Sequence, residues 1–222
     1  ATELFIDYSD ISFGKLIWVR HDTLSLANLT LSGNSDGNYL LYGDTAYLMV
    51  DHVIFIQDSA AGMGMMGGTS PIYLNCNDTY TGNKGAAIVD YCTFINTGSS
   101  SWQAYEYNAI NSYNADTISV TNSIFYIENQ YTYQYPNVMY PYAYSNGVSS
   151  VTPHHMSHNL IWGYDNHVYY YDNTQQYINY TGSNGNISAD PNFAEPSSNN
   201  FKLLWYSPAI DAADQSNLYA DG

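Results

Sequence analysis

The chain has 222 residues, and its 20 acidic residues face only four basic ones, which gives a formal net charge of -16. Nucleic acid and anionic lipid are excluded as partners, because neutralising their phosphates requires clustered Lys and Arg. A hydrophobic fraction of 45% and an aromatic fraction of 16% indicate a folded core and exclude a disordered chain. No run of 18 apolar residues is present, so we expect no transmembrane segment.

Short runs of alternating apolar residues, separated by clusters of Gly, Asn, Ser and Asp, indicate an all-β fold. Five segments repeat one pattern: an aliphatic residue, a polar or turn-forming residue two positions later, and a large apolar residue three positions after that. Their central residues are Asn28, His52, Tyr91, Asn122 and His158. The variable intervals between them are typical of stacked coils that carry loop insertions.

The pattern contains a change of parity that has a structural meaning. In the fourth segment, Ile118 and Val120 face one side of a strand, but after Asn122 the inward side passes to Ser123 and Phe125. A slip of one residue without a loop requires a sharp bend between two strands. Asn and His tolerate the left-handed backbone conformation that such a bend requires. The repeat therefore predicts a parallel β-helix in which each coil completes the core of its neighbours.

Two sets of positions follow from this prediction. The central residues of the five segments should lie at equivalent bends. The inward positions should be buried in stacked rows; they are Val50, Phe55, Val89, Cys92, Phe94, Val120, Phe125 and Ile161.

The region from Gly185 to Phe193, with Phe201–Leu203 and Ser207–Ala212 after it, resembles the closing motif of bacterial right-handed parallel β-helix proteins. More narrowly, it is similar to that of the extracellular proteins labelled choice-of-anchor Q domain proteins, and the opening stretch 6–11 resembles a strand motif of the same group. The resemblance implies a right-handed β-solenoid, an extracellular or cell-surface location and further residues after Gly222. It implies no particular reaction, because members of this group mostly lack one.

We expect a single domain over residues 1–222, with about six to eight coils. It divides into an entry strand segment (1–23), regular coils (24–127), a tyrosine-rich excursion (128–153), and the last coils with the closing segment (154–222). We expect Phe201–Ile210 to cap the end of the stack.

Candidate catalytic residues are few. Asp51 and Asp90 occupy the same outward position of the repeat. If their coils are adjacent, the carboxylates lie about 4.8 Å apart, near the separation used by retaining glycoside hydrolases. The alternative is that both are ordinary solvated aspartates, and we favour it. Polysaccharide lyase chemistry has even less support, because four scattered basic residues offer little choice of base. Whether the chain is an enzyme stays open, and the sequence leans against it.

The sequence gives only weak indications of a metal site. His154, His155 and His158 are spaced so that a helix would bring two imidazoles together, but we interpret the first two as surface residues and His158 as a bend residue. The stretch 34–38, with Asp44, has the composition of a weak calcium loop, although a polar turn is the simpler interpretation. We therefore expect no cofactor, with calcium as the weak alternative.

Tyrosine is unusually abundant, with 25 residues. Two excursions concentrate it, and their tyrosines are candidate interface residues. These are Tyr131, Tyr133, Tyr135, Tyr140, Tyr142, Tyr144, Tyr169 and Tyr171. Three interpretations compete: packing of loops on the solenoid, a protein–protein interface, and a platform on which a carbohydrate stacks.

Cys76 and Cys92 are the only cysteines, and two interpretations stay open. They form a disulfide in an extracellular chain, or Cys92 is a small buried apolar residue. The glycosylation candidates are Asn77, Asn179 and Asn186, whereas Asn28, a fourth sequon, should be unmodified if its side chain is committed to the bend.

The leading function from sequence is a non-catalytic extracellular structural or adhesive β-solenoid whose partners are copies of itself. It would assemble into a filament or surface array. The alternative is a carbohydrate-active enzyme on the same scaffold, and a glycan-binding module is third. Fold alone does not choose among them.

Overall fold

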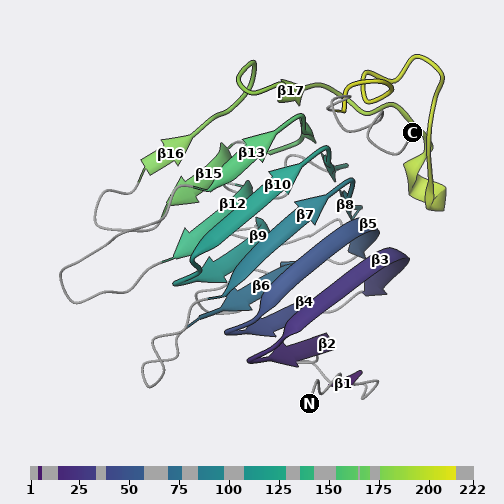
Figure 1. The fold of residues 1–222 in the computed structure, drawn as a ribbon. Helices are drawn as coiled ribbons and strands as arrows, with labels where there is room; N and C mark the ends of the chain where they lie inside the picture. The colour runs from purple at the N-terminus through teal and green to yellow at the C-terminus, as the bar shows by residue number, and fades with distance from the viewer. Residues whose placement is uncertain are drawn as a thin grey trace, which may run out of the picture.

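The computed structural model describes residues 5–6, 15–33, 39–57, 70–76, 85–97, 108–128, 136–142, 154–164, 166–170 and 176–213. These residues form an all-β structure built from two large, mainly parallel sheets (Figure 1). The helical content of the described ranges is one turn of 3-10 helix, Pro196–Ser198. None of the described residues forms a helix long and apolar enough to cross a membrane.

The first sheet, here called sheet A, has eight strands. In spatial order they are β1 (Phe5–Ile6), β2 (Lys15–Arg20), β4 (Tyr39–Asp44), β6 (Ile72–Asn75), β9 (Asn108–Tyr113), β12 (Asn137–Tyr142), β15 (Asn166–Tyr170) and β16 (Gln176–Ile178). The six inner strands pair in parallel, whereas β1 and β16 at the two edges are antiparallel to their neighbours.

The second sheet, sheet B, bends across its width. Before the bend lie the first halves of β3 (Thr23–Gly33) and β5 (Tyr47–Gln57), with β7 (Ala86–Asp90), β10 (Thr117–Thr121) and β13 (His155–Ser157). After it lie their second halves, with β8 (Thr93–Asn96), β11 (Ile124–Ile127), β14 (Leu160–Trp162) and β17 (Ile187–Ser188). The chain passes repeatedly from sheet A to sheet B, one step along the stack each time.

The bend is made by the five residues that the repeat predicts. Asn28, His52, Tyr91, Asn122 and His158 all have positive φ, between 47° and 56°. Their preceding residues are in register across the sheet, from Ala27 through Asp51 to Ser157. The prediction that these residues occupy equivalent bends is confirmed, and we call them the bend row.

The parity slip places large side chains from both halves of sheet B in one core. Burial along β5 changes phase at His52, so that Val50 and Val53 both face inward. The rings of Phe55, Phe94 and Phe125 stack at centroid distances of 4.8 and 4.7 Å. All eight inward positions predicted from the repeat are buried, which confirms that prediction.

The inward position just after the bend becomes polar toward the end of the stack. From β5 onward it is occupied by Val53, Cys92, Ser123, Asn159 and Asn186, all buried. The Asn159 Nδ2 donates to the carbonyl of Val120 and to Asn186 Oδ1, both at 2.9 Å. Its Oδ1 accepts from the backbone N–H of Ser123 at 3.0 Å. These side chains satisfy the backbone groups that the bends remove from strand pairing.

The closing segment lies along the side of the stack, and not over its end as the sequence suggested. Its hairpin, β18 (Phe193–Glu195) and β19 (Asn200–Leu203), forms a separate sheet. Phe193, Phe201 and Leu203 pack in one apolar cluster with outward residues of sheet B, which reach from Ile54 to Trp162. The cap was mispredicted because these outward positions are also apolar and must be covered.

Candidate functional site

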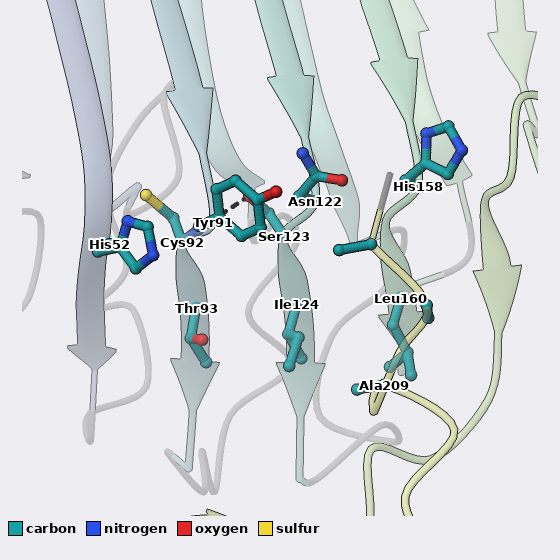
Figure 2. Close-up of a pocket in the computed structure, with 12 residues that line it drawn as sticks. His52, Tyr91, Cys92, Thr93, Asn122, Ser123, Ile124, His158, Leu160 and Ala209 are labelled. Carbon is teal, nitrogen blue, oxygen red and sulfur yellow. Dashed lines mark hydrogen bonds between the residues drawn. The ribbon is translucent and has the colours of Figure 1, made fainter. Parts of the chain in front are cut away.

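Four members of the bend row form one wall of a groove on the outside of sheet B: His52, Tyr91, Asn122 and His158. Figure 2 shows these four on successive strands, with Thr93, Ile124 and Leu160 further along the same strands. The closing segment supplies the opposite wall through Ala209, Ala212 and Ala213, and the groove has a volume of about 220 Å³. The imidazole of His52 and the ring of Tyr91 stack at 4.9 Å with an interplanar angle of 17°.

Asp51 and Asp90 stand beside this groove as direct register partners on neighbouring strands. The adjacency that the hydrolase alternative requires is therefore present. However, Asp90 Oδ1 accepts hydrogen bonds from Thr121 Oγ1 (2.7 Å), Asn122 Nδ2 (2.9 Å) and the Tyr91 N–H (3.1 Å). Asp51 Oδ1 lies 2.8 Å from His52 Nδ1. Asp90 thus ties neighbouring strands of sheet B together at the bend, which is a structural use of the carboxylate.

The Asp51–His52 pair lies close to Cys92, which suggests a comparison with a thiol catalytic triad. The Cys92 sulfur does not fit a triad, because it is buried and donates hydrogen bonds to the carbonyls of Val50 and Asp90. Burial raises the pKa of the Cys92 thiol to about 12, so the reactive thiolate is absent at neutral pH.

The two cysteines are free, and this settles the alternatives left open above. Cys76 follows β6 in sheet A and accepts a hydrogen bond from the Gly85 N–H at 3.1 Å. Cys92 follows the bend in sheet B and donates to backbone carbonyls. Each sulfur is buried in its own surroundings, so the disulfide alternative is wrong for this structure and Cys92 is a small buried residue.

The three clustered histidines have separate roles. His154 is buried, not on the surface as we interpreted it, and its Nδ1 accepts the Ile118 N–H at 3.0 Å. His155 is exposed and lies 3.1 Å from Ser157 Oγ, while His158 belongs to the bend row. No group of three His, Cys, Asp or Glu residues suited to a metal ion occurs in the described part of the chain.

We expect acid to destabilise the fold between about pH 6.5 and 4. Burial lowers the pKa of His154 and His167 to about 4, whereas an unfolded chain binds their protons near pH 6.5. The unfolded state therefore binds more protons in this interval, and the free energy of unfolding falls by up to about 3 kcal/mol per histidine before levelling off.

Urea unfolding at a series of pH values measures this dependence. The matched variant is His154→Asn, whose Oδ1 can still accept the Ile118 N–H but carries no proton. It should lose less stability than the wild type as pH falls through the same interval. An identical loss in both proteins would show that His154 makes no contribution.

The calcium alternative concerned residues 34–38 and Asp44. The loop lies outside the described residues, and the Asp44 carboxylate lies 3.1 Å from Arg20 Nε. Within the described residues, Asp44 is the one carboxylate of the proposed calcium loop, and Arg20 neutralises it.

Most candidate interface tyrosines also lie outside the described residues. These are Tyr131, Tyr133, Tyr135, Tyr144 and Tyr171; Tyr140 and Tyr142 are in β12 and Tyr169 in β15, with side chains that the structure does not describe. A different aromatic row, which the sequence did not reveal, crosses the outer face of sheet A through Trp18, Tyr42 and Tyr73. The rings of Tyr42 and Tyr73 stack at a centroid distance of 5.3 Å. Each ring therefore covers a face of the other, and a sugar could not stack on the covered faces.

Of the glycosylation candidates, Asn77 lies outside the described residues and Asn179 is exposed. The structure argues against the prediction that Asn186 is glycosylated. Asn186 is fully buried, and its Nδ2 donates to the carbonyls of Met156 and Ser183 at 3.0 and 2.8 Å. A glycan on this nitrogen would require the bend to open. Asn28 is exposed at its bend, so burial does not protect its side chain from glycosylation.

Comparisons with known proteins give no relatives: no family model, no curated protein and no solved structure matches this chain. The class that the structure itself defines is an all-β protein of stacked parallel strands.

Proposed function

We propose that this chain is a right-handed parallel β-helix of the choice-of-anchor Q type, and a non-catalytic extracellular structural or adhesive protein that associates with copies of itself. Three observations support the fold: alternation between two parallel sheets, bends in register and a core shared by both sheets. Parallel crossovers are right-handed with few exceptions.

Self-association is supported mainly by the edge of sheet B. Within the described residues, the 11-residue strand β3 pairs only with β5, and at the opposite edge β13 pairs only with β10. An unpaired edge of this length is a template for another chain. Sheet A differs, because the antiparallel strands β1 and β16 end its parallel series. A joint between copies would therefore run through sheet B.

The simplest joint adds the first half of β3, residues 23–27, of one copy to β13 of the next in the existing register, because β14 beside it already pairs with β17. A row of outward side chains, Ser25, Met49, Ile88, Ser119 and His155, crosses the sheet in that register. In the joint, Ser25 of one copy would stand beside His155 of the other. Such a head-to-tail contact does not close on itself and so produces a filament.

This geometry allows a charge test by sedimentation velocity at moderate salt. We expect the wild type to form species larger than the monomer as concentration rises. The double variant Ser25→Lys/His155→Lys should remain monomeric, because like charges would stand opposite each other across the joint. This variant also has a smaller net negative charge than the wild type. If overall charge repulsion between copies controlled association, the variant would therefore associate more strongly, not less.

The variant Ser25→Lys/His155→Glu is the matched control, because it keeps the net charge and places opposite charges across the joint. It should associate at least as well as the wild type. A wild type that stays monomeric at high concentration would contradict self-assembly, and association of the double lysine variant would contradict this joint.

A further inference from the structure

We propose that the outer face of β5 and β7 is a docking surface for an extended segment of another protein that carries a Lys or Arg two residues from an apolar residue. The surface, here called the outer platform, consists of Tyr47, Met49, Asp51, Ile88 and Asp90. It is separate from the edges proposed for self-association, since it lies on the face of the central strands.

The apolar part of the platform is exposed to an extent that is unusual for large side chains. The exposed fractions are 53% for Tyr47, 42% for Met49 and 55% for Ile88. Met49 and Ile88 are register partners, and Tyr47 lies two residues before Met49 on the same face. Contiguous exposed apolar residues bordered by polar ones are typical of protein interaction sites.

The acidic part lies one further step along the same strands. Asp51 and Asp90 are register partners two residues after Met49 and Ile88. Among the described residues, His52 is the only ion-pair partner of these carboxylates. Asp90 Oδ1 is engaged in the three hydrogen bonds given above, so Asp90 would meet a cation through Oδ2. The platform therefore complements a ligand with an apolar group and a positive charge.

The spacing specifies the ligand further. Residues two apart on a strand face the same side and lie about 7 Å apart. An extended peptide along β5 matches this spacing when its basic residue follows or precedes an apolar residue by two positions. Its apolar side chain then contacts Met49 or Ile88 while its cation reaches the carboxylates.

Two other occupants fit less well. A saccharide prefers several exposed aromatic faces, but the platform offers only Tyr47, since His52 and Tyr91 beside it stack on each other. A second copy of this chain has only four basic residues, and Arg20 among them is paired with Asp44. The net charge of -16 also opposes docking of a copy on an acidic surface.

Fluorescence anisotropy with labelled twelve-residue peptides tests the proposal. The probe repeats Leu-Ser-Lys-Ser three times, and a scrambled probe of the same composition places each Leu next to a Lys, on opposite faces of an extended chain. We expect the regular probe to bind and the scrambled probe to bind about tenfold more weakly.

Variants of the protein then locate the site. Asp51→Asn/Asp90→Asn and Met49→Ser/Ile88→Ser should each weaken binding of the regular probe about tenfold. The control Glu128→Gln/Glu195→Gln removes the same charge from surface positions outside the platform and should leave binding unchanged. No binding by the wild type, equal binding of both probes, or an equal loss in the control would overturn the proposal.

Discussion

Replacing Phe94 by alanine is expected to lower the free energy of unfolding by about 4 kcal/mol. Phe94 is completely buried and is the middle ring of three, with Phe55 and Phe125 on its two faces. Truncation leaves a cavity that the flanking rings cannot fill, because each is fixed on its own neighbouring strand of sheet B. Urea unfolding followed by circular dichroism measures the loss.

The neighbouring variant Thr93→Ala serves as control, because Thr93 faces outward on the same strand and is only partly buried. It should change the free energy of unfolding by less than about 1 kcal/mol. A loss at Phe94 no larger than this would show that the ring stack does not stabilise the packing of these strands.

The second large effect is expected at Asn159, where alanine should cost about 3 to 5 kcal/mol. The substitution leaves the Val120 carbonyl and the Ser123 N–H without a described side-chain partner, whereas Asn186 Oδ1 keeps the backbone N–H of residue 159. A buried polar group that loses its partner costs about 1–3 kcal/mol, and such losses are not additive. The same unfolding experiment measures it.

Asn179→Ala is the matched control, because the Asn179 side chain is exposed and bonds only locally, to the Thr181 N–H at 2.8 Å. It should cost less than about 1 kcal/mol. Equal effects of the two alanine variants would mean that Asn159 does not stabilise the bend.

The repeat pattern was sufficient to predict the bends and the core because both depend on the order of side chains along a short segment. A change of parity at Asn122 or His158 has only one structural solution without a loop. The polarity of the next inward position was not predicted. In an asparagine-rich chain, Asn159 and Asn186 resemble surface residues, and Asn186 was assigned to glycosylation for that reason. For Asn159, its alignment with Cys92 and Ser123 in the repeat was the available signal.

The position of the closing segment could not be predicted from its own sequence. Phe193 and Phe201 show that it has an apolar side, but not which surface that side covers. The missing information lay in other strands: Ile54, Ile124 and Trp162 are apolar at positions whose parity points outward. A strand that is apolar on both faces requires a second cover. The outer platform shows the opposite case, where apolar outward residues stay exposed.

The attachment of the closing segment has a mechanical consequence. Every described hydrogen bond of residues 190–213 stays within that segment, and its contact with the strands of sheet B is through side chains. A tension applied to the C-terminal side would therefore load apolar contacts one after another, while the paired strands beneath would resist through many backbone hydrogen bonds in parallel. The segment should peel away at low force and uncover a fresh apolar stripe, with the stack intact below it.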